Sequence, residues 1–267
     1  FMKYIILNWK LFPENEAKAI QLASLIYKDY IKLDSGLQKK YRIILCPPSI
    51  FISPIYKSLI PNKYRNILYL GGQNVFYHNR GAYTGEISPV MLKSYDIKYC
   101  IIGHSERKNI FKENNIDINL KIKALLNQNI KPIICTGENK RNNKENASSF
   151  RIKNEIFRQL NEYLKGIPVE KAHNLIIVYE PAWAISQNNP SDLPDPVDAK
   201  NMIHNIRFWL STRFNGIIAQ NISILYGGSV NHKNIKQYLE ISNGVLIGSA
   251  STKKEKITKL IKRLPIK

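Results

Sequence analysis

The sequence predicts one α/β domain, residues 1–267, in which eight parallel strands close into a (β/α)8 barrel with the helices outside. Short apolar runs recur along the chain, stretches with helical periodicity separate them, and 267 residues is an ordinary length for one such barrel. Eight strands that alternate with helices favour a parallel sheet, and eight is a number that closes into a barrel. Periodicity alone leaves a doubly wound open sheet as the alternative.

Each predicted strand is a short, mostly apolar run of the kind that a parallel sheet buries on both faces. No linker or shift in composition divides the chain, so we expect a single domain. The predicted strands are Tyr4–Asn8, Tyr41–Cys46, Ile67–Gln73, Tyr99–Gly103, Pro132–Cys135, Leu175–Glu180, Ile222–Tyr226 and Val245–Ile247.

Helical periodicity is clear in several of the stretches between these strands. The predicted helices include Glu16–Ile31, Ile116–Gln128, Phe150–Leu164 and Val197–Leu210. Long irregular loops in compact domains are often functional, so two further segments are of interest. They are the polar segment Asn139–Asn146 and the proline-containing segment Ser186–Pro196.

The chain carries a formal net charge of +20, which raises the question of nucleic-acid binding. The lysines are scattered over every predicted helix and loop, without zinc-finger spacing or an RNA-binding signature, so we expect no specific nucleic-acid partner. A positive field would still attract an anionic substrate. No run of about 18 apolar residues predicts a membrane span. Three cysteines (Cys46, Cys100 and Cys135) without metal-site spacing predict reduced thiols in a cytoplasmic protein without a bound metal.

Polar residues cluster where the predicted strands end, and in a parallel barrel these ends converge on the face that holds the active site. The first strand is followed by Lys10, a cation suited to an anionic substrate. The groups that follow the strands are Asn8-Trp9-Lys10, Gly103-His104-Ser105-Glu106-Arg107, Glu180, Gly227-Gly228-Ser229 and Gly248-Ser249.

Each group has a chemical interpretation. His104 precedes a helical turn, where the helix dipole favours a neutral imidazole that donates a hydrogen bond. Glu106 would order Lys10 or His104, or cap that turn. The two glycine-containing turns after the seventh and eighth strands are typical of a phosphate site built from backbone N–H groups. Glu180 is a carboxylate at a strand end, and the Trp183 that follows it is a candidate for the body of a lid.

Taken together, these motifs resemble the triosephosphate isomerase family, and the resemblance runs nearly end to end. The matching segments, in order, are Asn8-Trp9-Lys10, Gln73-Asn74, Gly81-Ala82-Tyr83-Thr84-Gly85-Glu86, Ile102-Gly103-His104-Ser105-Glu106-Arg107, Cys135-Thr136-Gly137-Glu138, Tyr179-Glu180-Pro181-Ala182-Trp183-Ala184-Ile185 and Tyr226-Gly227-Gly228-Ser229-Val230-Asn231.

The resemblance implies interconversion of dihydroxyacetone phosphate and glyceraldehyde 3-phosphate through an enediol, a step of glycolysis and gluconeogenesis, without a metal or organic cofactor. It implies that Glu180 is the base, that neutral His104 polarises the carbonyl, and that Lys10 stabilises negative charge. It assigns supporting roles to Asn8 and Glu106, and phosphate-binding amides to Ser186, Ser229, Gly248 and Ser249.

The resemblance also implies a homodimer in which the loop Gly81–Glu86 inserts into a neighbouring subunit, with Thr84 reaching toward its active site. The sequence departs from the family after Ile185, where Ser186-Gln187-Asn188 replaces Gly-Thr-Gly and a few extra residues follow. Without glycine, the hinge of the lid has less backbone freedom. Two alternatives therefore stay open: a related isomerase of a four-carbon ketose phosphate, and a non-catalytic binding protein that uses its basic surface.

Overall fold

The strands of the computed structural model form a closed barrel in the order β1-β2-β3-β4-β5-β6-β7-β8, and every neighbouring pair is parallel. The structure describes residues 2–59, 68–140, 149–185 and 195–265. The closed ring confirms the predicted barrel and excludes the open sheet. The strands are β1 (Lys3–Asn8), β2 (Tyr41–Cys46), β3 (Leu68–Gly72), β4 (Tyr99–Ile102), β5 (Lys131–Thr136), β6 (Ile176–Tyr179), β7 (Ser223–Tyr226) and β8 (Gly244–Ile247).

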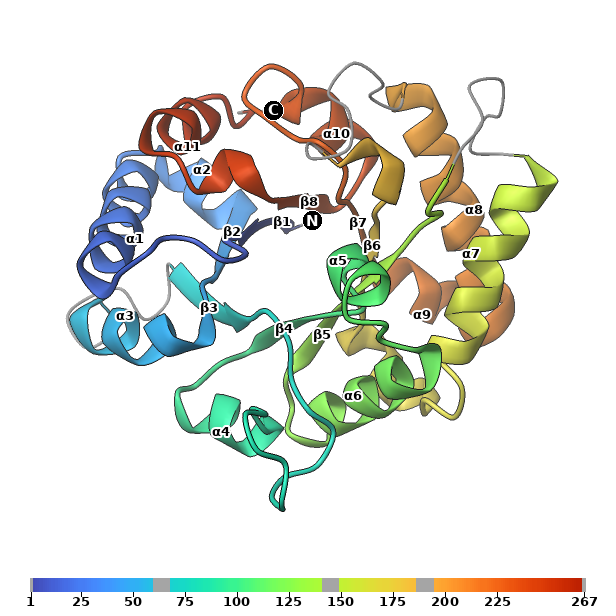
Figure 1. The fold of residues 1–267 in the computed structure, drawn as a ribbon. Coiled ribbons are helices and arrows are strands. Elements are labelled where there is room, and N and C mark those ends of the chain that lie inside the picture. Colours follow the sequence, from blue (N-terminus) through green and yellow to red (C-terminus); the bar gives the residue numbers. More distant parts are fainter. Residues whose placement is uncertain (1, 60–67, 141–148, 186–194, 266–267) are drawn as a thin grey trace.

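The helices surround the strands (Figure 1), so the sheet is buried on both faces. The longer helices are α1 (Glu16–Ile31), α6 (Asn115–Asn127), α7 (Phe150–Tyr163) and α8 (Pro196–Phe214). The shorter ones are α2 (Ser35–Lys40), α3 (Ile52–Leu59), α4 (Pro89–Ser94), α5 (Ser105–Asn109), α9 (Gly216–Asn221), α10 (Ile235–Ile241) and α11 (Lys254–Ile261). The 3-10 helices are η1 (Ser49–Phe51), η3 (Val169–Asn174), η4 (Ala182–Ala184) and η5 (Ser249–Ser251).

Side-chain caps explain where several helices begin. The Asn15 side chain accepts a hydrogen bond from the Lys18 amide at the start of α1, and Asn114 does the same for α6. Asp195 caps α8, whose first residue is a proline that needs no N–H partner. The helix α8 extends beyond the predicted Leu210 to Phe214, and it stops where Asn215 takes a positive φ of 83°.

Two apolar layers hold the barrel together. The larger lies between the strands and the helices, and the smaller fills the inside of the barrel. The inner layer consists of Tyr4, Ile6, Ile44, Cys46, Tyr99, Ile101, Ile133, Cys135, Ile176, Val178, Leu225 and Leu246, with Tyr69 packed against it. The barrel is therefore a filled core, and its functional groups have to lie at its ends.

Asn243, directly before β8, joins three strands. Its backbone N–H donates to Ile224 in β7 (2.8 Å), and its carbonyl accepts from Tyr4 in β1 (2.9 Å). Its side-chain Oδ1 accepts from the Ile224 amide and from Arg207, each at 3.0 Å. These contacts close the ring at the amino ends of the strands.

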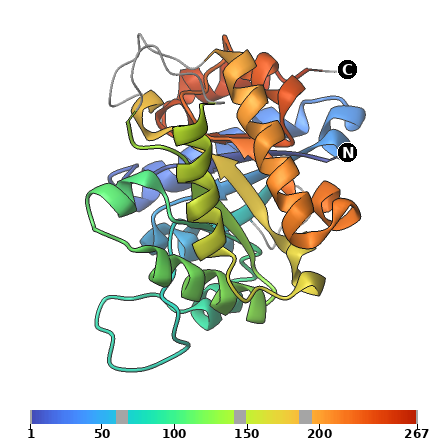
Figure 2. The ribbon, with the colours of Figure 1, turned by 90° about the vertical axis from the view of Figure 1, so that its right-hand side faces the viewer.

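The strands run from the side where β1 begins, on the right of Figure 2, toward the side that carries α5, on the left. The carboxyl ends of the strands therefore lie together near α5. Among the described residues no helix is long and apolar enough to cross a membrane.

Candidate active site

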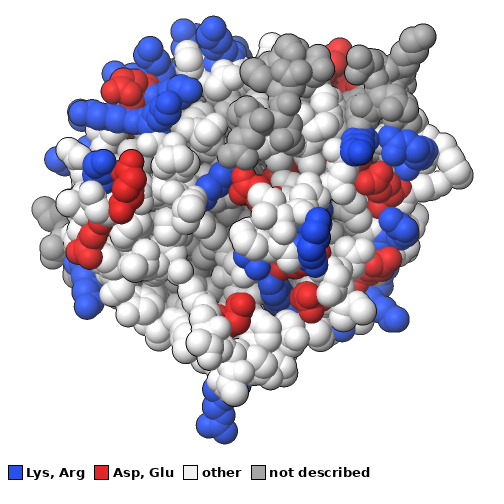
Figure 3. Space-filling model, viewed as in Figure 1, with Lys and Arg blue, Asp and Glu red and all other residues white. Residues whose placement is uncertain are grey.

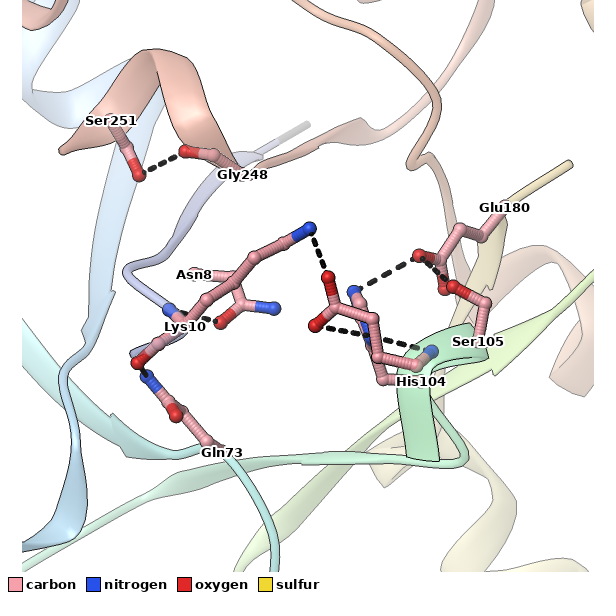
Figure 4. Close-up of polar contacts among 9 residues, drawn as sticks. Asn8, Lys10, Gln73, His104, Ser105, Glu180, Gly248 and Ser251 are labelled. Carbon is pink, nitrogen blue, oxygen red and sulfur yellow. Dashed lines mark hydrogen bonds and ion pairs between the residues drawn. The ribbon is translucent and has the colours of Figure 1, made fainter. Parts of the chain in front are cut away.

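The predicted site residues converge at the carboxyl ends of the strands, as Figure 4 shows for Lys10, His104 and Glu180. A pocket at this face is lined by all three of these side chains. The same pocket is lined by the turns after β7 and β8, including Gly228, Ser229, Gly248 and Ser249. Ser186, also predicted at this site, lies outside the described residues.

Lys10 is held in an unusual backbone conformation with a φ of 53°. Its amide donates to Asn8 Oδ1 (3.0 Å), and its carbonyl accepts from Gln73 Nε2 (2.9 Å). A positive φ is uncommon for a residue other than glycine, and it persists only when neighbours fix it. The ammonium group pairs with Glu106 Oε1 at 2.6 Å, so Glu106 orders Lys10, one of the alternatives that the sequence left open.

His104 is the N-cap of α5 and 4% exposed. Its Nδ1 accepts a hydrogen bond from the Glu106 amide at 3.3 Å, and its Nε2 lies 3.0 Å from Glu180 Oε1. Because Nδ1 is an acceptor, the proton of the ring is on Nε2, which donates to Glu180. Nδ1 also lies 3.6 Å from Glu106 Oε2, and the neutral imidazole stays a prediction.

Glu180 follows β6 and is 3% exposed. Its Oε1 accepts from Ser105 Oγ (3.1 Å) as well as from His104. A Cβ on Gly227 would lie 3.3 Å from Glu180 Cβ, so the absence of a side chain there leaves room for the carboxylate arm. Its neighbour Cys135 stays a thiol, because burial, and after it the charge of Glu180, raise the pKa of Cys135 well above its ordinary value.

The turns after β7 and β8 line the pocket beside these side chains. Ser229 donates both its amide (3.2 Å) and its hydroxyl (2.8 Å) to the carbonyl of Ala184 in η4. The turn η4, which contains the predicted lid residue Trp183, is thus tied to the predicted phosphate site. Gly248 lies against Lys10, since a Cβ there would be 3.2 Å from Lys10 Cε.

Trp183 is anchored by a residue that the site prediction did not include. Its Nε1 donates to Glu138 Oε1 at 2.8 Å, and Tyr179 OH donates to the same oxygen at 3.2 Å. Glu138 is fully buried. Gln73 and Ser105 were likewise not predicted as site residues. The sequence signal for all three was their place within the quoted motifs, beside the residues that were predicted.

The face around the site carries both signs of charge. In Figure 3, Lys and Arg are distributed around the rim of this face and are interspersed with Asp and Glu. No cluster of three or more His, Cys, Asp or Glu side chains in the described ranges has a geometry that could hold a metal ion.

Known proteins with the same organisation identify the family. The family model described as "Triosephosphate isomerase" matches residues 3–264. The triosephosphate isomerase of Dictyoglomus thermophilum is 36% identical over 262 residues, covering 97% of this chain and 98% of that protein. The triosephosphate isomerase of Dehalococcoides mccartyi is 38% identical over 269 residues, covering 99% and 98%.

Solved structures agree with this assignment. The crystal structure of triosephosphate isomerase from Bartonella henselae superimposes with a TM-score of 0.80 at 28% identity, covering 98% of this chain and 99% of that one. The chain belongs to the triosephosphate isomerase family and is an intramolecular aldose–ketose isomerase.

Proposed function

We propose that the protein interconverts dihydroxyacetone phosphate and D-glyceraldehyde 3-phosphate through an enediol, with Glu180 as the base. The observation that carries this proposal is the contact of 3.0 Å between Glu180 Oε1 and the Nε2–H of His104, with Lys10 lining the same pocket. The division of roles follows the family resemblance. No further group is required to move the proton, because a carboxylate accepts it and an imidazole donates to the oxygens.

The contacts suggest how the substrate enters. His104 Nε2 donates to Glu180 Oε1. A substrate carbonyl that takes the place of Glu180 at this nitrogen is polarised, and Glu180, released from His104 and Ser105, reaches the adjacent carbon. Lys10 then stabilises negative charge on the substrate oxygens, and its ion pair with Glu106 fixes the position of the ammonium group. Asn8 supports the position of Lys10 by accepting a hydrogen bond from the Lys10 amide.

We propose that the backbone amides of Ser186, Ser229, Gly248 and Ser249 bind the phosphate. The Ser229 amide donates to the Ala184 carbonyl at 3.2 Å, so a phosphate that binds this amide would compete with Ala184 for it. This competition would couple phosphate binding to the position of Ala184 in η4, next to Trp183 of the proposed lid, whose closure would exclude water. A four-carbon ketose phosphate stays the alternative substrate, because the longer segment after Ile185 distinguishes this chain from the family pattern.

We also propose that the protein is a single-domain, cytoplasmic homodimer. The segment between β3 and α4 projects from the body of the molecule (Figures 1 and 2) and carries an exposed Tyr83 beside Thr84. A groove that reaches Lys10 and His104 is bordered by apolar side chains. Its exposed members are Leu11 (90%), Phe12 (49%), Ile110 (67%) and Phe111 (65%). A partner's projecting segment would cover this apolar surface and complete the wall of the site.

Two measurements test these proposals. A coupled assay with glyceraldehyde 3-phosphate and with a four-carbon ketose phosphate compares the two substrates. In the same assay, Glu180→Asp should lower kcat by at least about 100-fold, because the shorter side chain moves the carboxylate by about 1 Å. Glu170→Gln, an exposed position on η3, is the matched control and should leave kcat unchanged. If Glu180→Asp left the activity intact, Glu180 would not be the base. Sedimentation of Leu11→Arg should show monomers if the groove is the dimer contact.

A further inference from the structure

A second group of polar side chains lies at the opposite end of the barrel from the active site. In register, Tyr4 of β1 pairs with Arg42 of β2, and Tyr99 of β4 pairs with Lys131 of β5. Paired residues of parallel strands point to the same side of the sheet, and Tyr4 and Tyr99 belong to the layer inside the barrel. Arg42 and Lys131 therefore face inward too. With Tyr69, these residues are called the floor cluster.

The two cations of the floor cluster have no acidic partner within residues 2–59, 68–140, 149–185 and 195–265. Arg42 Nη1 donates to the hydroxyl of Tyr99 (2.9 Å), and its guanidinium lies 4.8 Å from the centre of the Tyr69 ring. The Lys131 ammonium makes no hydrogen bond or ion pair with a residue in the described ranges, and both cations are half-buried. Burial and the neighbouring charge of Arg42 lower the pKa of Lys131.

The hydroxyl groups of the cluster are donors as well. Tyr4 is 8% exposed, and its hydroxyl has no hydrogen-bond partner in the part of the chain that the structure describes. The Tyr99 oxygen accepts from Arg42, which leaves its hydrogen free to donate. Burial raises the pKa of Tyr99 to about 12, so this hydroxyl keeps its proton. The rings that carry these hydroxyls lie together, since Tyr4 and Tyr69 each pack edge-on against Tyr99, with centroids 6.3 and 5.8 Å away.

Nearby Lys3 shows how an isolated cation is otherwise satisfied at this end of the barrel. Its ammonium donates to the carbonyls of Leu239 and Ser242, near the end of α10. Lys98, also at this end, pairs with Asp96 at 2.5 Å. Arg42 and Lys131 differ from both, because neither meets an acidic group or a carbonyl among the described residues.

We propose that the floor cluster is an anion site that binds a phosphate group, with Arg42 and Lys131 supplying charge and Tyr4 and Tyr99 supplying hydroxyl donors. A planar guanidinium matches the oxygens of phosphate, and charge-assisted hydrogen bonds to it are strong. The site is separate from the proposed substrate phosphate site. Tyr4 and Asn8 lie at opposite ends of β1, about 13 Å apart at roughly 3.3 Å per residue.

The first test measures the melting temperature of the full chain with increasing inorganic phosphate, against chloride at equal ionic strength to control for screening. We expect phosphate to raise the melting temperature of the wild type. Arg42→Met and Lys131→Met should lose at least half of this increase, while Lys98→Met, at the ion-paired lysine, should retain it. In Arg42→Met and in Lys131→Met, kcat/KM for triose phosphate should stay within about twofold of the wild-type value. The inhibition of the isomerase reaction by phosphate should also stay within about twofold.

Calorimetry separates this site from the active site, because phosphate should bind two sites per chain in the wild type and one in Arg42→Met. Tyr4→Phe removes one hydroxyl donor without changing the packing, and it should weaken phosphate binding at the floor cluster several-fold. This variant keeps the test valid if Arg42→Met does not fold. Repeating the titration with glycerol 2-phosphate distinguishes free phosphate from a phosphate ester as the ligand. Equal melting-temperature increases in the wild type, Arg42→Met, Lys131→Met and Tyr4→Phe would overturn the proposal.

Discussion

Gly227→Ala is expected to damage both stability and catalysis, because a methyl group has no room at this position. A Cβ there would lie 2.5 Å from Val178 Cγ1 and 3.3 Å from Glu180 Cβ. Carbon atoms in contact prefer about 3.5–4.0 Å, so the overlap with Val178 is about 1 Å. Overpacking of this kind costs about 1–3 kcal/mol of unfolding free energy. A shift of about 1 Å passed on to Glu180 would lower kcat about 100-fold.

Urea denaturation and a coupled isomerase assay measure these effects, and Val178→Ala tests their cause. Alone, Val178→Ala should cost about 2 kcal/mol through the loss of two buried methyl groups. In the double variant Gly227→Ala/Val178→Ala the clash is absent. The losses of unfolding free energy in the two single variants should therefore add up to at least about 1 kcal/mol more than the loss in the double variant. The activity should recover only in part, because the contact of 3.3 Å with Glu180 remains.

Gly216→Ala is the matched control for this substitution. A Cβ at Gly216, the first residue of α9, meets nothing within 4 Å, and alanine favours a helix over glycine, so stability should stay equal or rise. The reasoning would be refuted if Gly227→Ala kept wild-type stability and kcat, or if the costs of the two substitutions were fully additive.

Three further predictions concern contacts near the site. Trp183→Phe removes the donor to fully buried Glu138 and should lower the unfolding free energy by about 1–3 kcal/mol in urea titrations; an unchanged midpoint would contradict the bond. Ser229→Ala removes the hydroxyl bond to the Ala184 carbonyl but keeps the amide, and should cost about 0.5–1.5 kcal/mol without abolishing activity; loss of all activity would assign the hydroxyl a larger role. Burial raises the pKa of all three cysteines above the ordinary thiol value of about 9. Above that pH the unfolded chain releases thiol protons that the folded chain keeps, so the free energy of unfolding falls as the pH rises. Cys135→Ala should make this fall shallower by up to about 1.4 kcal/mol per pH unit, and an identical slope would count against the buried thiol.

Much of this fold could be predicted from local sequence signals. Helix α1 begins and ends where its periodicity predicted, Glu16–Ile31, because Asn15 caps it and its apolar face is continuous. The predicted end of α8 was four residues short, since Ser211–Phe214 adds little apolar periodicity. The actual stop signal was Asn215 before Gly216, a pair suited to a positive φ.

The site was predictable to the extent that parallel strands place their carboxyl ends together. That rule brings Lys10, His104 and Glu180 to one face without knowledge of any contact. The bonds of Ser105 to Glu180 and of Glu138 to Trp183 depend on side chains far apart in the sequence, which periodicity cannot pair. The floor cluster needed the register of neighbouring strands, since its members are isolated polar residues within apolar runs.

The junction at Asn243 has a consequence for how the chain folds. Tyr4 pairs with Gly244, so the ring closes between segments near opposite ends of the sequence, and contacts of such long range form slowly. Until Asn243 reaches Tyr4 and Ile224, β1 and β7 expose unpaired edges that can associate with other chains. Pairing of β8 with β1 and β7 is therefore the step at which we expect folding and aggregation to compete, and the hydrogen bonds of Asn243 bring β8 to both edges.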